Sequence, residues 1–295
     1  MIVLSSQERQ EDSELELLFN IPIGLIDPNH PSISLEAKKA ILRDRYHEKL
    51  ISDGLETGNF ILNQDGGINF QTKLPQYTFS GFIFEALAVR ILNDNMRTIG
   101  RNAFAWCSNR TKTTFDYIEQ FKAIGTGFNS TKNQHPDFYN FQHRFDIQFI
   151  RKNHKTNLYD PATVLGTTRD AGIQVKAITG NEKTEIIMPL ISGKYSHVLT
   201  FLRHENGKHS HTVCIEILQS MYQNNEIDLS QKNKLENAIK SPEMLGENQQ
   251  NVDDYYNYIN YWYQGKANPD DIIYDGVGLE IKGFKYHNGI LIPDN

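Results

Sequence analysis

The segment that most constrains the fold is residues 172–178, Gly-Ile-Gln-Val-Lys-Ala-Ile. Side chains of a β-strand alternate between its two faces, so Gln174 and Lys176 project to one face and the intervening apolar residues to the other. A lysine among apolar neighbours is costly to bury unless it is paired or used. The segment therefore predicts a buried strand that carries two functional polar side chains.

The composition is typical of a globular protein, with 39% hydrophobic residues, 16 Phe and 14 Tyr among 295 residues. No apolar run reaches the roughly 18 residues that a membrane span requires, and the N-terminal segment lacks the pattern of a signal peptide. Cys107 and Cys214 are the only cysteines, so we expect a cytoplasmic protein without membrane partners. A net charge of −6 gives no global basic signature for nucleic acid, although a local basic groove can coexist with an acidic remainder.

Hydrophobic periodicity predicts helices over 35–53, 80–95, 114–124, 229–240 and 254–263. Ser80 is expected to cap the second of them. Alternation predicts strands at 103–107, 145–150, 172–178, 185–190, 197–203, 212–218, 272–281 and 284–292. The 197–203 and 212–218 strands are expected to form a hairpin around Gly207.

This order of elements predicts an α/β fold with a mixed central β-sheet flanked by helices. We divide the chain into an accessory segment (1–75), a core (76–220) and a C-terminal helical and strand extension (221–295). Residues 153–170 must form a long loop or an inserted turn within that core. The aromatic run 254–263 is more typical of a core or a subunit interface, including that of a homodimer, than of a base-stacking surface.

Four residues form a set with a common chemistry. Glu85 lies at the edge of the apolar stripe of the 80–95 helix, and Asp146 alternates with apolar residues on the 145–150 strand. Phosphodiester hydrolysis needs a divalent metal that polarises the phosphate and lowers the pKa of the attacking water. We expect Mg²⁺, with Mn²⁺ as a substitute, bound by Asp146, Glu85 and the Gln174 amide oxygen. Lys176 would orient the water or neutralise charge on the phosphate.

This order resembles the PD-(D/E)XK nuclease superfamily, particularly the Mrr-like restriction and defence endonucleases with a Gln-x-Lys motif. The helix Gly81–Leu92 looks like the Phe-Glu-x-Leu helix that precedes the catalytic sheet in such enzymes, and Asp146 and the Gln174-Val-Lys176 strand follow it in order. The resemblance covers roughly residues 78–220 and implies a mixed four-stranded sheet flanked by helices, with metal-dependent cleavage of DNA. Two features depart from the family pattern: Asp146 lacks the preceding Pro, and Gln174 follows it by 28 positions.

Other residues could replace members of this set. Asp137 belongs to a literal Pro-Asp in a polar stretch without strand alternation, and Asp170 lies close to the Gln-x-Lys strand. Glu280 and Lys282 form a second Glu-x-Lys motif beside Asp275, with little room for two adjacent strands between Asp275 and Glu280.

A zinc site is a further alternative. The potential ligands are His204, His209, His211 and Cys214. They lack a second Cys pair and would straddle the expected hairpin, so we interpret them as solvated hairpin residues.

Each member of the set alone is typical of a solvated strand face or a helix boundary, but their order and element types together favour a nuclease. We therefore expect a Mg²⁺-dependent endodeoxyribonuclease of the restriction or anti-phage defence type, with DNA as its partner. The alternatives are a nuclease of the same fold that acts on RNA or single strands, and a non-catalytic nucleic-acid-binding or assembly subunit. No Walker-type loop, nucleophile elbow or dinucleotide fingerprint occurs.

Overall fold

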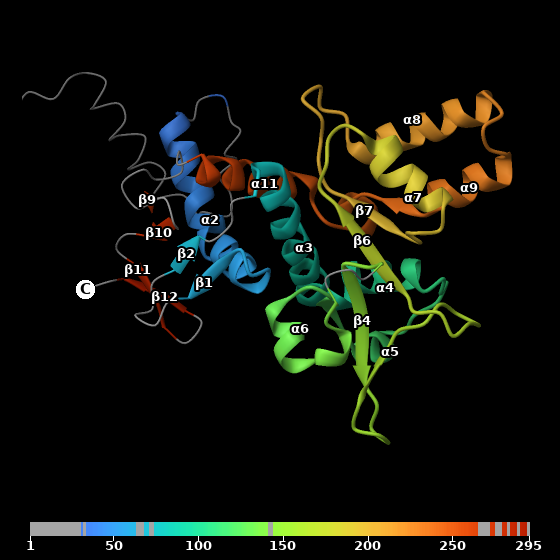
Figure 1. Cartoon of the computed structure of the whole chain (residues 1–295), viewed down its shortest axis with the longest axis horizontal. Coiled ribbons are helices and arrows are strands. Elements are labelled where there is room, and N and C mark those ends of the chain that lie inside the picture. The colour runs from blue at the N-terminus through green and yellow to red at the C-terminus, as the bar shows by residue number, and fades with distance from the viewer. Residues whose placement is uncertain are drawn as a thin grey trace, which may run out of the picture.

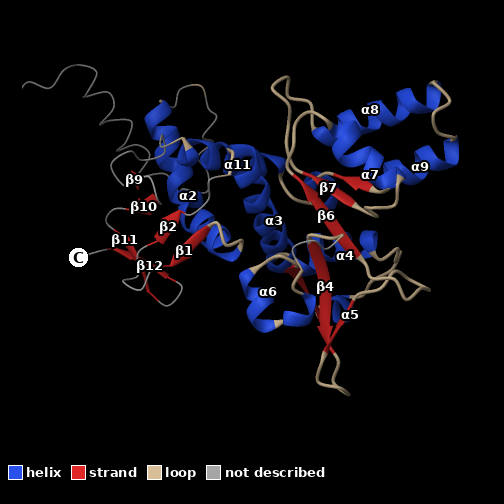
Figure 2. Ribbon diagram, in the orientation of Figure 1, coloured by secondary structure: helices blue, strands red, loops and turns tan. Residues whose placement is uncertain are grey.

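The structure, a computed structural model, describes residues 31, 34–62, 68–70, 74–140 and 144–264, and four strands at 272–274, 279–281, 284–287 and 290–293. The helices (Figures 1 and 2) are α2 (Leu35–Glu56), α3 (Gln76–Asp94), α4 (Arg101–Cys107), α5 (Phe115–Ile118), α6 (Asn129–Gln134), α7 (Met188–Ile191), α8 (Ser210–Gln223), α9 (Leu229–Asn237), α10 (Pro242–Leu245) and α11 (Gln249–Tyr263). Single turns of π-helix at Met96–Gly100 and Lys183–Ile187, and of 3-10 helix at Pro136–Phe138, complete the helical segments.

The strands are β1 (Phe60–Leu62), β2 (Ile68–Phe70), β3 (Phe121–Gly125), β4 (Ile147–Lys152), β5 (Tyr159–Pro161), β6 (Gly172–Lys176), β7 (Val198–Thr200), β8 (Ile239–Lys240), β9 (Ile272–Tyr274), β10 (Leu279–Ile281), β11 (Phe284–His287) and β12 (Ile290–Pro293). The central sheet has the order β3-β4-β6-β7-β8, and β5 pairs with the outer half of β4. The β3–β4 and β4–β6 pairs are antiparallel, whereas β6–β7 and β7–β8 are parallel. The predicted α/β fold with a mixed central sheet flanked by helices is therefore confirmed.

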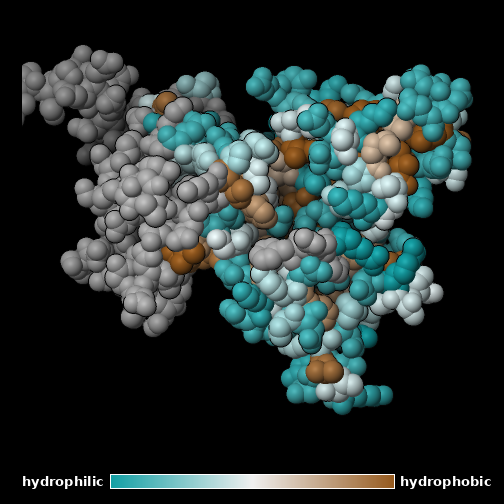
Figure 3. Space-filling model, viewed as in Figure 1, coloured by the Kyte–Doolittle hydropathy of each residue, from teal (hydrophilic) through white to brown (hydrophobic). Residues whose placement is uncertain are grey.

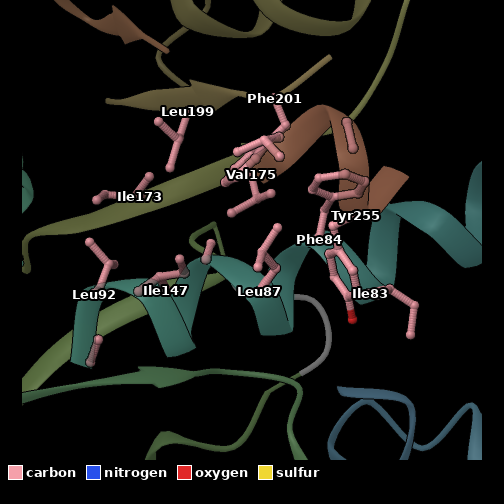
Figure 4. Packing of buried hydrophobic residues seen from close by; sticks show 14 of the residues in the cluster. Ile83, Phe84, Leu87, Leu92, Ile147, Ile173, Val175, Leu199, Phe201 and Tyr255 are labelled. Carbon is pink, nitrogen blue, oxygen red and sulfur yellow. The ribbon is translucent and has the colours of Figure 1, made fainter. Parts of the chain in front are cut away.

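Helix α3 packs on one face of this sheet. Its apolar stripe, which includes Phe84 and Leu87, lies against Ile173 and Val175 of β6 (Figure 4). Each fully buried side chain of this size contributes about 1.5–3 kcal/mol relative to an exposed one. The helix begins after Pro75, and Ser80 is buried inside it. The expectation that Ser80 caps the helix is therefore wrong.

The opposite face of the sheet is covered by α7, α8 and α9 (Figure 1). The predicted strands at 185–190 and 212–218, and with them the hairpin, are wrong because both segments are helical. Parallel neighbours need a crossover connection, which is usually helical, and the segment with Lys183–Ile191 joins β6 to the parallel β7. In α8, Cys214, Leu218 and Met221 follow helical spacing and are buried.

Two further sequence predictions between 103 and 124 are wrong. The expected strand at 103–107 is part of α4, whose Phe104 and Cys107 lie on one buried face. The expected helix over 114–124 ends at Ile118, and Phe121–Gly125 forms β3, which pairs with β4. Short apolar runs of this kind fit either element, and here the pairing with β4 decides.

The remaining predicted elements occur with shifted bounds. Helices 35–53, 80–95 and 254–263 are found as α2, α3 and α11, and the helix predicted over 229–240 ends at Asn237 before β8. Strands 145–150, 172–178 and 197–203 are found as β4, β6 and β7, and segment 272–281 contains two paired strands, β9 and β10. The 153–170 insertion holds β5 and a bridge between Thr163 and Asp170.

Helices α2 and α11 join α3 in one hydrophobic core with the sheet. The aromatic residues Tyr255, Tyr258 and Trp262 of α11 are buried there, so this stripe is core. Asp53 of α2 is also buried, and its carboxylate accepts hydrogen bonds from Arg90 at 2.7 Å and from the Tyr255 hydroxyl at 2.6 Å. The three-part division of the chain stays a prediction.

The visible surface of the described residues is largely hydrophilic, with small separate hydrophobic patches (Figure 3). Within the described ranges, every helix is too short or too polar to cross a bilayer.

Candidate functional site

The site lies where three strand ends meet. Gly125, the last residue of β3, pairs with Ile147, the first residue of β4, and Ile147 pairs in turn with Ile173 of β6. Asp146 comes directly before β4. The alternation of the sequence had suggested that it lies within the strand. Its N–H donates to the Ile173 carbonyl at 3.0 Å and its carbonyl accepts from the Thr126 N–H at 2.9 Å. The backbone of Asp146 is therefore fixed from both neighbouring strands.

The Asp146 carboxylate extends this pairing through its side chain. Its Oδ2 atom accepts the Val175 N–H at 2.7 Å and the Gln174 Nε2 amide at 2.5 Å. Hydrogen bonds to an ionised acceptor are shorter and stronger than neutral ones. Oδ2 is thus held by β6, and the described residues offer the second oxygen, Oδ1, no hydrogen-bond donor.

Glu85 shares a small pocket with Asp146. The pocket has a volume of about 50 Å³. Its other lining residues are Thr126, Gly127 and Phe128, which follow β3, Thr57, which follows α2, and Phe82 of α3. A cavity of this size can hold a cation or a small number of waters. Glu85 is half-buried and makes no hydrogen bond or ion pair with any described residue.

The two carboxyls are electrostatically coupled. Burial raises the pKa of Asp146 to about 6, although the Val175 N–H, the charge of Lys176 and the Gln174 amide favour its ionised form. Burial, followed by the negative charge of Asp146, raises the pKa of Glu85 well above its ordinary value, and Lys176 opposes this shift. Two nearby carboxyls repel each other when both are ionised, and a bound cation would stabilise this doubly ionised form.

Gln174 and Lys176 complete the set from β6. Gln174 is buried, and its Oε1 atom has no hydrogen-bond partner among the described residues. An acceptor left in this state costs roughly 1–3 kcal/mol. The Lys176 Nζ atom lies 3.9 Å from Oε2 of the exposed Glu185 and 5.4 Å from the centre of the Tyr195 ring. An ion pair with such an exposed carboxylate is weak, so the Lys176 ammonium remains available to another anion.

The donor set fits a hard divalent cation. Two carboxylates and an amide oxygen suit Mg²⁺ or Mn²⁺ and not the softer, nitrogen- or sulfur-bound metals. Among the described residues, no three His, Cys, Asp or Glu side chains gather as a metal-binding group. Such a metal therefore has two charged protein ligands at most, and waters or phosphate oxygens must complete its coordination.

The alternative acids lie elsewhere. Asp137 is exposed in the Pro136–Phe138 turn, and Asp170 lies before the start of β6, whereas Asp146 contacts the Gln174–Val175 half of that strand. Neither lines the pocket with Glu85. For the second Glu-x-Lys motif, Asp275 and Lys282 lie outside the described residues, and only the backbone of Glu280, in β10, is described. That alternative stays a prediction.

The zinc alternative has no support among the described residues. His204 Nε2 lies 2.5 Å from Glu182 Oε1, and His209 accepts a hydrogen bond at the start of α8. His211 and Cys214 are on α8 itself. The interpretation of these four residues as a hairpin is also wrong, because the second strand of that hairpin is this helix.

Sequence reasoning missed several residues around the set. Thr126 and Gly127 line the pocket because β3 ends there, and the Gly125-Thr-Gly127 text could have indicated this turn. Glu185 and Tyr195 reach Lys176 from the crossover between β6 and β7. No local sequence signal marks either of them.

Comparisons of the chain with known protein families, with curated proteins and with solved structures found no match. We therefore infer the function of the chain from the geometry of this site.

Proposed function

We propose that the chain is a Mg²⁺-dependent endonuclease that hydrolyses DNA phosphodiester bonds, of the restriction or anti-phage defence type and related to the PD-(D/E)XK superfamily. The observation that supports this most is the Asp146 carboxylate, which is held by Gln174 and Val175 of the adjacent strand and shares a pocket with Glu85. Lys176 follows on the same strand, and its charge acts on both acids. Residues 61 and 91 positions apart in sequence are thus brought to one end of the sheet.

Each of the four residues would have a separate role in hydrolysis. When bound, a divalent cation polarises the phosphate and lowers the pKa of the attacking water. Asp146 and Glu85 would hold that cation, and Gln174 fixes the orientation of the Asp146 carboxylate and offers its own unpaired oxygen. The Lys176 ammonium would neutralise negative charge that develops on the phosphate.

Cleavage of supercoiled plasmid by purified protein tests this function. We expect Mg²⁺- or Mn²⁺-dependent nicking that EDTA abolishes and that falls by at least about 100-fold in Asp146→Asn and in Lys176→Ala, because electrostatic groups of this kind commonly contribute that much. Asp137→Asn is the matched control, since it makes the same chemical change on an exposed residue away from the pocket. Equal cleavage by the Asp146→Asn and Asp137→Asn proteins would reject the proposed site.

A non-catalytic nucleic-acid-binding subunit of the same fold is the second candidate. It is favoured by the small number of charged ligands, since the described residues hold no metal-binding group of three. Such a subunit would bind DNA in a salt-sensitive manner without cutting it under any metal condition. The same assay with RNA and with single-stranded DNA detects a nuclease of this fold that prefers those substrates to duplex DNA.

A further inference from the structure

A second, larger cavity opens next to the candidate site. It is a cleft of about 1000 Å³ between α4, the segments that precede β6 and β7, and the α9–β8 region. Phe145, which precedes Asp146, lines it, and so does Tyr195, whose ring lies 5.4 Å from the Lys176 ammonium. The cleft and the small pocket of Glu85 and Asp146 share no lining residue, but the consecutive residues Phe145 and Asp146 line one and the other.

The charge of the cleft is opposite to that of the whole chain. The chain has 36 acidic and 30 basic residues. The charged residues that line the cleft are Arg110, Arg144, Arg169, Lys234, Lys240 and a single acid, Asp170. A concave surface lined by one sign of charge concentrates the field and attracts ligands of the other sign.

These cations are not neutralised by the protein. In the ranges that the structure describes, none of the five forms a salt bridge. Arg110 has a structural role, since it donates to the Thr163 carbonyl at 2.6 Å and lies over the Phe104 ring. Arg144, Arg169 and Lys234 are exposed. Most of the positive charge is therefore available to a ligand.

The wall of the cleft also carries an aromatic platform. Trp106 is half-buried, its indole N–H donates to the Asn237 carbonyl at 2.7 Å, and the Lys240 ammonium lies 5.6 Å from the centre of its ring. His197 meets the same ring edge-on at 5.0 Å. Burial lowers the pKa of Lys240, so an anion beside this ammonium would favour its charged form.

We propose that this cleft binds the sugar-phosphate backbone of a nucleic acid and leads the scissile phosphate to Asp146 and Lys176. That the bound backbone leads toward Asp146 and Lys176 rests on the proposed nuclease function. Binding of the backbone in the cleft does not require catalysis. Arg144 and Arg169, which precede β4 and β6, would contact the phosphates. Lys234 and Lys240, which lie within the C-terminal extension, would contact them as well. That extension thereby becomes part of the substrate-binding surface.

The test measures binding of labelled duplex DNA, single-stranded DNA and RNA by fluorescence anisotropy over a salt series, with EDTA present to prevent cleavage. Removal of one interaction with a phosphate lowers the slope of log K against log salt by roughly 0.9 for duplex DNA. We expect the variant with Arg144→Ala, Arg169→Ala and Lys240→Ala to show a slope lower by roughly two to three and an affinity at least about 10-fold weaker. The nucleic acid that binds most tightly to the parent protein identifies the natural source of the backbone.

The matched control carries Lys132→Ala, Lys152→Ala and Lys155→Ala. This variant removes the same net charge from exposed positions. Lys132 lies on α6, Lys152 is the last residue of β4, and Lys155 follows it. We expect its salt slope to equal that of the parent. An equal loss in the two triple variants, or no loss in the cleft variant, would overturn the inference.

Two further measurements keep the result interpretable. If the cleft variant fails to fold, as judged by its circular dichroism and melting curve, Arg169→Ala alone should lower the slope by roughly one, because this side chain is exposed. Cleavage by the parent protein with Mg²⁺ is scored separately. Binding that depends on the cleft, without cleavage, supports the inference and rejects the proposed nuclease. Cleavage that is unchanged by the cleft mutations rejects the inference alone.

Discussion

Asp146 combines a structural and a chemical property in one side chain. One carboxylate oxygen extends the hydrogen-bond ladder at the β4–β6 junction, while burial beside Glu85 raises the pKa of the group to about 6. The first property stabilises the pairing of the strands, and the second makes the ionised protein less stable unless a cation is present. The two effects predict opposite responses to pH and to metal, so they can be separated by experiment.

The first prediction concerns the pH dependence of stability. Because the pKa of Asp146 in the folded protein is about 6 and that of an unfolded Asp is about 3.9, the folded state binds the proton more tightly. Without metal, the contribution of Asp146 to the stability of the parent protein should therefore decrease as the pH rises from about 4 to about 6 and stay low above it. Asp146→Asn cannot ionise, so at pH 7.5 in EDTA it should exceed the parent by up to about 3 kcal/mol.

Urea unfolding at pH 4 and pH 7.5 measures this difference. At pH 4 the two proteins should be nearly equal, and Mg²⁺ at pH 7.5 should raise the melting temperature of the parent but not that of Asp146→Asn. A parent protein that is more stable than Asp146→Asn at pH 7.5 in EDTA would indicate a purely structural carboxylate.

The second prediction concerns Gln174. Gln174→Glu adds a charged oxygen next to Asp146 Oδ2, so it should lower the melting temperature in EDTA, tighten metal binding and keep or raise cleavage. Gln174→Leu preserves the bulk but removes the oxygen and the hydrogen bond to Asp146, and it should abolish cleavage. Isothermal titration with Mn²⁺ and the plasmid assay check both variants. Plasmid cleavage by Gln174→Leu at the parental rate would show that the site lies elsewhere, first at Glu280 and Lys282.

Strand alternation in the sequence places Gln174 and Lys176 on one face of β6. The residues that contact Lys176 could not be predicted. Glu185 was assigned to a strand, and it reaches Lys176 only because a helical crossover returns the chain beside β6. A contact made through such a crossover depends on tertiary packing and leaves no local pattern.

Among the secondary structure elements, the helices α2, α3 and α11 were the best predicted, whereas the 14-residue helix α8 was predicted in part as a strand. The apolar stripes of α3 and α11 extend over several turns, and α11 also carries buried Tyr255 and Trp262. Short segments failed where an apolar run of five to seven residues fits both helix and strand. In α4 and α8 the protein buries one helical face, whereas in Phe121–Gly125 the pairing with β4 imposes a strand.

The third prediction concerns the junction of α2, α3 and α11. Asp53 is buried and receives hydrogen bonds from Arg90 and Tyr255. Asp53→Asn removes the charge that Arg90 faces, and loss of one partner from a buried pair should cost about 3–5 kcal/mol in unfolding free energy. Glu216→Gln is the matched control, since its carboxylate pairs with Lys208 on the surface and its loss should cost no more than about 1 kcal/mol. Urea unfolding distinguishes the two, and equal small losses would mean that the junction is held by aromatic packing alone.

At the scale of the whole molecule, the sequence predicted the class of the fold but not the order of its strands. The alternating segments indicated a mixed sheet, yet β8 has only two residues, Ile239 and Lys240, and lies at the end of the segment predicted as the 229–240 helix. A strand this short has no recognisable period, and its place beside β7 depends on the crossover through α8 and α9. The basic cleft was missed for the same reason, since its wall combines α4 with β8.

Diffraction from crystals soaked in Mn²⁺ will show whether Glu85, Asp146, Gln174 and Lys176 form one metal-dependent site. We expect one anomalous peak within coordination distance of the Asp146 and Glu85 carboxylates, with the Gln174 amide adjacent, and no peak there in Asp146→Asn crystals. A fully ordered pocket without a peak at saturating Mn²⁺ and bound oligonucleotide, or a peak at acids elsewhere in the chain, would contradict it.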